Sequence, residues 1–341
     1  MIRRLCALLL AAGIGGCAAG TSPAPPAGPA SRAAFSAGGA QSVPQVKFFS
    51  IPSQGWPEYI TNGPDGNLWF TEFYTDKIAR ITPSGTVTEF SLPSGDDVEA
   101  LVTGPDKNIW FTEPGADKIG RMTTSGTVTD FPLKNINPSP RGIANGPDGN
   151  LYFGDYYSGD LGRITPSGAI RIFPIQQYSS PWEVAAGADG NMWVTDSGAG
   201  QLSRFDPRSQ KFLTPLQLRA RANPWGIILG PDRHIWFTER HDGKIAVVGN
   251  AGKVAEFAIP NCHLCYPDDL AAGPDGNFYF TESLAGAIGR FNPKTGKFLA
   301  AIQLTTQDIP TSIVAGPDGN MWFTNPSYNG PNNRIGVVLL H

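Results

Sequence analysis

The sequence has few of the residues on which several classes of protein depend. Of its 341 residues only four are cysteines and four are histidines, and charged residues make up 16%. Lysine and arginine total 26 against 29 acids, a formal net charge of -3, so the charge gives no indication of nucleic acid as a partner. The apolar stretch from Leu5 to Ile14 is too short to span a bilayer. The leader and the internal repeats are therefore the informative features of the sequence.

Residues 1–16 have the pattern of an export signal. Arg3 and Arg4 precede the apolar stretch, and Gly15, Gly16 and Cys17 follow it. This end resembles a bacterial lipobox, in which the cysteine becomes the lipidated first residue of the mature protein. We therefore expect Cys17 to be lipidated, with an ordinary signal peptide cut nearby as the alternative.

Alanine, proline, glycine and serine dominate residues 17–44, a composition that cannot bury a core and is typical of a flexible tether. The sequence therefore predicts an exported lipoprotein, held at a membrane by its lipid and facing the periplasm or the cell exterior.

Seven copies of one phrase organise the rest of the chain. The phrase Gly63 to Glu72 (GPDGNLWFTE) recurs with substitutions at steps of 41, 42, 41, 43, 43 and 43 residues. Its Pro-Asp-Gly part has the chemistry of a hairpin turn, and the apolar run after it suits a strand buried between two sheets. That period is the length of a four-stranded propeller blade. Residues 45–341 are therefore predicted to form an all-β, seven-bladed β-propeller in one domain, and we expect a monomer.

The ends of the chain predict how the ring closes. The last copy ends after residues 334–338 without an outermost strand, whereas residues 46–52 match residues 87–93 position for position at an offset of 41. We therefore expect residues 46–51 to form the outer strand of the last blade.

Two sets of equivalent positions are expected to meet at one end of the channel. The first set follows the proline that starts each blade, a place that Val98 holds in the second blade: Glu58, Glu99, Arg141, Trp182, Trp225, Asp268 and Thr311. The second set follows the Trp-Phe-Thr run: Glu72, Glu113, Asp155, Asp196, Glu239, Glu282 and Asn325.

Crowded carboxylates can coordinate a hard divalent cation or attract a cationic ligand. Glu58, Glu99 and Asp268 are the candidate ligands for Mg²⁺ or Ca²⁺, because they are non-repeated choices at their position, and Asp268 is also the candidate catalytic residue. The alternative is that the second-set acids are structural, paired with the repeated arginines Arg80, Arg121, Arg163, Arg204 and Arg290.

Aromatic residues crowd the same rim, with Trp56, Trp182, Trp225 and Tyr266 beside the first strands. Together with the acids they predict a site for an aromatic, cyclic-peptide, sugar or cationic ligand. The predicted ligand-binding residues are Glu58, Glu99, Arg141, Trp182, Trp225 and Thr311.

With Cys6 removed and Cys17 lipidated, Cys262 and Cys265 are the remaining thiols of an exported protein, so a short-loop disulfide is expected. Zinc is the weaker alternative, because two cysteines need further ligands and His263, His241 and Asp268 do not form a second pair at suitable spacing.

At this level of detail the repeats resemble the virginiamycin B lyase family. The likeness rests on residues 63–72 and on the segments 76–82 and 117–123, and it extends over residues 45–341. The resemblance implies a lyase that opens a cyclic depsipeptide at its ester by elimination, with Mg²⁺ stabilising the developing charge and a histidine taking the proton.

Several of the positions that the resemblance assigns to catalysis hold other residues here. Asp268 and Thr311 stand where the family has histidines, and Ile309 and Asn325 stand where it has metal-binding acids, with Asp308 displaced by one residue. We therefore expect a ligand-binding propeller with lost or altered lyase activity. The alternative is a metal-dependent carbon-oxygen lyase or a lactone hydrolase acting on a cyclic depsipeptide or lactone.

Overall fold

The computed structural model describes residues 43–92, 97–134, 137–219, 222–249, 252–327 and 332–340. The predicted signal peptide and Cys17 lie outside these residues, as does most of the tether. Residues from Val43 to His341 form one compact unit. No helix in the described part of the chain is long and apolar enough to cross a membrane.

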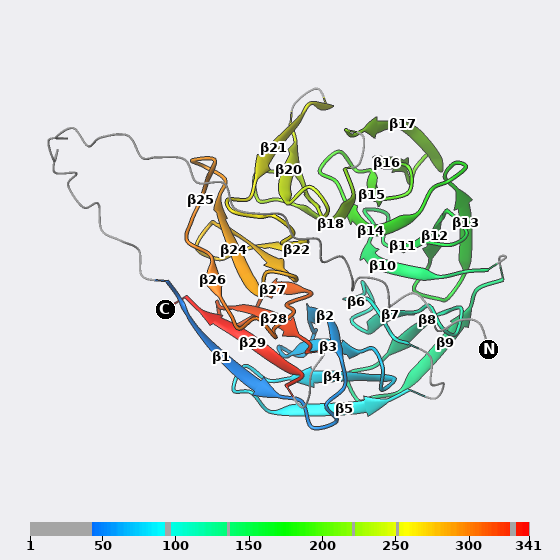
Figure 1. Ribbon diagram of the computed structural model, residues 1–341. Coiled ribbons are helices and arrows are strands. Elements are labelled where there is room, and N and C mark those ends of the chain that lie inside the picture. The colour runs from blue at the N-terminus through cyan, green and yellow to red at the C-terminus, as the bar shows by residue number, and fades with distance from the viewer. Residues whose placement is uncertain are drawn as a thin grey trace, which may run out of the picture. The chain divides into compact units, whose positions relative to one another are not determined.

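The architecture is a seven-bladed β-propeller of antiparallel sheets, as predicted (Figure 1). Blade 1 comprises β2 (Pro57–Asn62), β3 (Leu68–Glu72), β4 (Lys77–Ile81) and β5 (Val87–Ser91). Blade 2 comprises β6 (Leu101–Thr103), β7 (Ile109–Glu113), β8 (Lys118–Met122) and β9 (Val128–Pro132). Blade 3 comprises β10 (Pro140–Asn145), β11 (Leu151–Asp155), β12 (Asp160–Ile164) and β13 (Ile170–Pro174). Blade 4 comprises β14 (Pro181–Ala186), β15 (Met192–Asp196), β16 (Gln201–Asp206) and β17 (Lys211–Gln217).

The remaining three blades follow the same order, with two departures at the outer edge. Blade 5 comprises β18 (Pro224–Leu229), β19 (Ile235–Glu239), β20 (Lys244–Val248) and β21 (Val254–Ala258). Blade 6 comprises β22 (Pro267–Ala272), β23 (Phe278–Glu282) and β24 (Ala287–Asn292), and its outer strand is divided into β25 (Lys297–Phe298) and β26 (Ile302–Gln303). Blade 7 comprises β27 (Ile313–Ala315), β28 (Met321–Asn325) and β29 (Arg334–Leu339), with β1 (Gln45–Ser50) as its outer strand.

Terminal strand exchange closes the ring, which confirms that prediction. β1 pairs antiparallel with β29, from Gln45 opposite Leu339 to Ser50 opposite Arg334, and the two strands lie side by side in Figure 1. Phe49 of β1 stacks on Trp322 at 5.4 Å between ring centroids. The last blade is thus held by residues from both ends of the described chain.

The second strand of each blade carries the core. In blade 1, Trp69 belongs to a buried cluster shared with blade 2, whereas Leu68 and Phe70 belong to one shared with blade 7. Alternate side chains of a strand point to opposite faces, so this strand packs against both neighbouring sheets. Burying each large apolar side chain contributes roughly 1.5 to 3 kcal/mol.

The hairpin turn explains why the phrase is repeated. Asp65 accepts a hydrogen bond from the Trp69 indole N–H at 3.0 Å, and Asn67 donates to the same carboxylate at 2.8 Å. Gly66 has a φ of 78°, in the left-handed region that glycine enters without cost. The turn residues therefore satisfy the polar edge of the tryptophan that the core buries.

Candidate functional site

A bulge in the first strand builds the end of the channel where the acids lie. Pro57 pairs with Glu72, but the register shifts before Ile60 pairs with Phe70. Both residues inside the shift, Glu58 and Tyr59, line a central cavity. The same shift follows the starting proline of four more blades, at Pro140, Pro181, Pro224 and Pro267.

The second-set acids are buried, and two of them bind the loops that lead into their own blades. Asp155 accepts the Ser139 backbone N–H at 2.6 Å. Asp196 accepts the Ser179 hydroxyl and the Ser180 N–H, both at 2.8 Å. These bonds hold the residues just before Pro140 and Pro181, so the two acids position the loops at this end of the channel.

The repeated arginines do not pair with these acids, and that prediction is wrong. Arg80 pairs with Asp65 at 3.4 Å and Arg121 with Asp106 at 3.6 Å, both at the Pro-Asp-Gly turns. The register explains the difference, because Arg80 lies directly opposite Trp69 rather than opposite Glu72. The arginine therefore lies nearer the other end of the blade.

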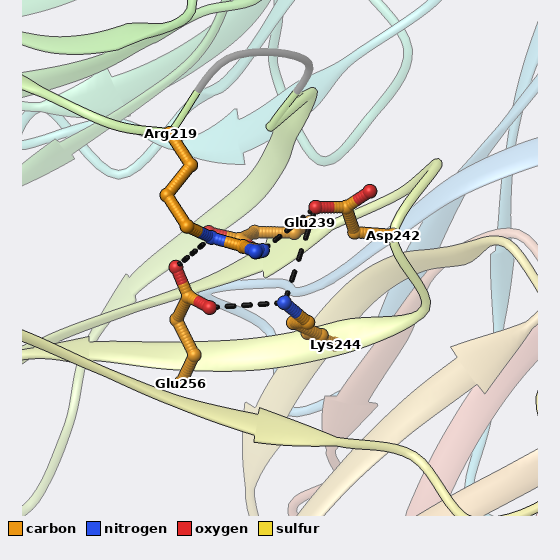
Figure 2. A network of polar contacts seen from close by, with 5 residues as sticks. All are labelled: Arg219, Glu239, Asp242, Lys244 and Glu256. Atoms are coloured by element: carbon orange, nitrogen blue, oxygen red, sulfur yellow. Dashed lines mark hydrogen bonds and ion pairs between the residues drawn. The ribbon is translucent and has the colours of Figure 1, made fainter.

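In blade 5 the acid belongs to a larger polar network, shown in Figure 2. Arg219 contacts Glu239 at 3.5 Å, Asp242 at 2.8 Å and Glu256 at 2.7 Å. Burial nevertheless raises the pKa of Glu239 to about 6, with the nearby Glu256 carboxylate adding to the effect. This arginine lies between blades in sequence and was not singled out by the repeat pattern.

The central cavity has a volume of about 150 Å³ and an aromatic wall. Trp182 and Trp225 stack at 3.8 Å between centroids, with their planes 29° apart. Glu58, Asp268 and Thr311 line the same cavity. The fold thus brings together five of the residues that the first set predicted for the site.

The central cavity carries less negative charge than its number of carboxyl groups implies, because burial favours the protonated form of Glu58. Burial raises the pKa of Glu58 to about 8, and the neighbouring Glu99 and Asp268 raise it further, against a hydrogen bond from the Trp56 indole. That bond is 2.6 Å long. At neutral pH the Glu58 carboxyl is therefore mostly protonated and can donate a hydrogen bond as well as accept one.

Arg240 supplies the positive charge of the site and was missed at the sequence level. Its Nε lies 2.6 Å from Asp268, and its guanidinium lies 4.3 Å from the Trp225 ring centroid. Burial raises the pKa of Asp268, while this arginine opposes the shift. Asp268 is consequently one half of an ion pair at the base of the tryptophan wall.

Deeper in the channel lie three residues that the sequence analysis also missed. The Tyr59 hydroxyl donates to Glu183 from across the ring, and Asp269 accepts the Ser312 hydroxyl at 2.8 Å. Burial raises the pKa of Glu183 to about 8 and that of Asp269 to about 6. The sequence did contain a signal for them, because all three lie two residues after the starting proline of their blade. Glu183 and Asp269 are the acids at that position.

Glu99 and Arg141 do not line the cavity. They form an ion pair with each other, and the Arg141 guanidinium lies 5.0 Å from the Trp182 ring centroid. This pair therefore supports the back of the aromatic wall. Among the described residues no three His, Cys, Asp or Glu side chains are grouped so that they could hold a metal ion.

The positions that the resemblance assigns to the metal are occupied by structural contacts. Asn325 accepts the Ile309 N–H at 3.1 Å and donates to Asp308 at 2.6 Å, and Asp308 also pairs with Arg334 at 2.6 Å. Ile309 has no side-chain donor atom. Because Mg²⁺ needs free oxygen ligands, this donor set does not fit a resident divalent ion.

Thr311 also lacks the chemistry of a proton acceptor. Its hydroxyl donates to the Glu58 carbonyl at 2.8 Å and contacts the Thr324 hydroxyl at 2.9 Å. The hydroxyl thus joins blade 7 to blade 1 and is engaged by the backbone.

Cys262 and Cys265 form a disulfide with an S–S distance of 2.02 Å. A sulfur in a disulfide is not a thiolate, so this pair does not provide a zinc ligand. The loop that it closes connects β21 to β22.

Taken with the ring of blades, this cavity defines a β-propeller with an aromatic, carboxyl-lined site at one end of its channel. Residues 37–211 and 210–338 match the Virginiamycin B lyase family, and the chain belongs to that family. No curated protein sequence gave a match.

Solved structures of this family are similar over most of the chain. A structure described as streptogramin B lyase is 29% identical, covers 87% of this chain and 98% of its own, and has a TM-score of 0.80. A catalytically inactive variant of virginiamycin B lyase from Staphylococcus aureus, solved with quinupristin, is also 29% identical, with coverages of 87% and 99% and a TM-score of 0.80. Hydrazine synthase from Kuenenia stuttgartiensis, 15% identical with a TM-score of 0.70 and coverages of 90% and 99%, shares the fold alone.

Proposed function

We propose that this chain is a ligand-binding propeller that keeps the scaffold of its lyase relatives and has lost or altered their reaction. The observation that carries the proposal is the central cavity itself. It has a stacked tryptophan wall, whereas the positions expected for the metal and the base are engaged in structural contacts.

The ligand should be a small molecule or peptide that presents an aromatic group. Trp182 and Trp225 offer a flat apolar surface, and a protonated Glu58 beside the Arg240–Asp268 pair offers both donors and acceptors. A volume of about 150 Å³ is below the range typical of sites that enclose a whole drug-sized ligand. The cavity would therefore hold one ring, with the rest of the ligand over the rim.

The rim has the exposed aromatic residues that such a ligand would contact. Tyr74 is 63% exposed and Tyr157 is 57% exposed. Tyr156 packs edge-on against Trp182 at 5.5 Å, which continues the cavity wall outward. Exposed aromatic side chains beside a hollow are typical of recognition surfaces.

The test uses quinupristin, the compound solved with the S. aureus relative, as the probe. We expect saturable binding, followed by tryptophan fluorescence, that weakens at least about tenfold in Trp182→Ala because a stacked aromatic contact is lost. Tyr178→Ala is the matched control, since Tyr178 is 80% exposed and does not line the cavity. Equal affinity in Trp182→Ala and the control would show that the cavity is not the site.

The same samples test the loss of catalysis. We expect negligible ring opening with Mg²⁺ present, because losing a positioned base or oxyanion contact typically costs two or more orders of magnitude in rate. Mass spectrometry separates the enzymatic alternatives: elimination opens the ring without changing the mass, whereas hydrolysis adds one water. Efficient opening that Asp268→Ala abolishes would show that the chemistry has moved to Asp268.

We also propose that the propeller is exported and anchored through lipid on Cys17, which the leader pattern supports. Cys17→Ala should move the protein from the membrane fraction to the soluble extracytoplasmic fraction. Membrane association that persists in this variant would contradict a lipid anchor and point to an uncleaved leader.

A further inference from the structure

One cross-strand pair of positions recurs in every blade, and the residues that occupy it are unusual in blade 6. The second-set residue lies directly opposite the first residue of the third strand, and both side chains of such a pair lie on the same face of the sheet. The pairs are Glu72–Lys77, Glu113–Lys118, Asp155–Asp160, Asp196–Gln201, Glu239–Lys244, Glu282–Ala287 and Asn325–Arg334. In blade 6 an alanine stands where the other blades have a polar or charged side chain.

In the three blades with lysine, the ammonium pairs with an acid of the outer strand, and in blade 2 it also reaches the inner acid. Lys118 Nζ lies 3.3 Å from Glu113 and 2.9 Å from Asp130. Lys244 Nζ lies 2.9 Å from Glu256 in the network of Figure 2. Each ammonium therefore has a carboxylate from the outer strand of its own blade.

Blade 6 lacks the outer acid as well as the lysine. The acids of the other blades face the third residue of the third strand, as Asp130 faces Gly120. Gly289 holds that place in blade 6, but the ladder there is interrupted between Phe298 and Ile302. Ala300 and Ala301 lie in this interruption, so small apolar residues replace the acid.

A cavity of about 460 Å³ lies at this part of blade 6, lined by Glu282, Gly289, Ala300 and Ala301 among others. Ile259, Phe280, Phe298 and the two alanines contribute apolar walls, and the loop closed by the Cys262–Cys265 disulfide covers one side. This cavity and the central one have no lining residue in common.

Glu282 is the acid that this cavity contains. The residue is 7% exposed. Within the described part of the chain, no hydrogen bond or ion pair reaches its carboxylate. Burial alone raises its pKa to about 7. Arg290 does not neutralise it, because its guanidinium lies over the Tyr279 ring, 5.7 Å from the centroid, on the opposite face of the strand.

We propose that this blade 6 cavity binds a primary ammonium carried on an apolar chain, with the ammonium beside Glu282 in the place of the missing lysine. Phe280, Phe298 and Ile259 would contact the apolar chain. A divalent metal ion is the poorer fit, because Glu282 is the one carboxylate among the described residues that line the cavity, and such an ion takes six or more oxygen ligands. An amine needs one anionic partner and gains from the apolar walls.

The experiment measures binding of n-hexylammonium by calorimetry, with n-hexanol as a neutral probe of similar shape, at about pH 8, where Glu282 is mostly ionised. We expect the amine to bind at least about tenfold more tightly than the alcohol and Glu282→Gln to remove that difference. Glu239→Gln is the matched control, because it changes the equivalent acid of blade 5 and should leave amine binding unchanged. Equal binding of the two probes by the unaltered protein would overturn the proposal.

Ala287→Lys provides a second, independent test. The new lysine should reproduce the contact of Lys118 with Glu113, fill the cavity, abolish amine binding and leave the melting temperature equal or higher. A strong fall in melting temperature, or unchanged amine binding in this variant, would show that the cavity is not the vacated place of a lysine side chain. This test remains decisive if Glu282→Gln fails to fold.

Discussion

Closure of the ring by β1 leads to a quantitative prediction for Phe49→Ala. The Phe49 ring stacks on Trp322 at 5.4 Å, and a Cβ added at Gly85 of blade 1 would lie 2.0 Å from that ring, so Phe49 touches two blades. A fully buried Phe→Ala change costs 3 to 5 kcal/mol, and Phe49 is half-buried, so we expect a loss of about 2 to 3 kcal/mol in the free energy of unfolding.

Phe90 provides the matched control, because it makes the same contacts in a blade that needs no exchanged strand. Its ring stacks on Trp69 at 5.4 Å and lies against Gly126 of the next blade. Phe90→Ala should therefore cost about as much as Phe49→Ala. In a thermal melt followed by circular dichroism, each variant should lower the melting temperature by about 3 to 5 °C. A neutral Phe49→Ala beside a destabilising Phe90→Ala would refute the closure by β1.

Three further predictions concern the site. The pKa values of Glu58 and Glu183 are raised to about 8, so between about pH 4.5 and 8 the folded state holds protons that the unfolded chain has lost. The free energy of unfolding should therefore fall as the pH rises through this range. A melting temperature as high at alkaline pH as at mildly acidic pH would contradict these shifts. Thr238→Val should destabilise by about 1 to 3 kcal/mol, measured by urea unfolding, because its hydroxyl accepts a buried backbone N–H at 2.9 Å. Arg141→Met should lower the free energy of unfolding by about 3 to 5 kcal/mol, because it leaves Glu99 buried without its cation. A loss below about 1 kcal/mol in urea unfolding would show that the pair is solvated.

The sequence repeat predicted correctly that several first-set residues lie together at one end of the channel, but it did not reveal all the residues of the site. Glu58, Trp182, Trp225, Asp268 and Thr311 line one cavity, because equivalent positions in a ring of blades lie at equivalent heights on the channel. The sequence did not predict a role for Arg240 or Arg219, because neither belongs to the two sets of equivalent positions. Their ion pairs also join residues far apart in the sequence.

The sequence by itself determined the number of blades, the strand exchange and the end of the channel where polar groups gather. This was possible because the 41- to 43-residue period and the residues of the turn are local properties of the sequence that recur in each copy. The tertiary structure alone decided which acids are paired, which are protonated and which remain without a cation. Those properties depend on burial and on neighbours across strands, as Arg80 opposite Trp69 and Ala287 opposite Glu282 show.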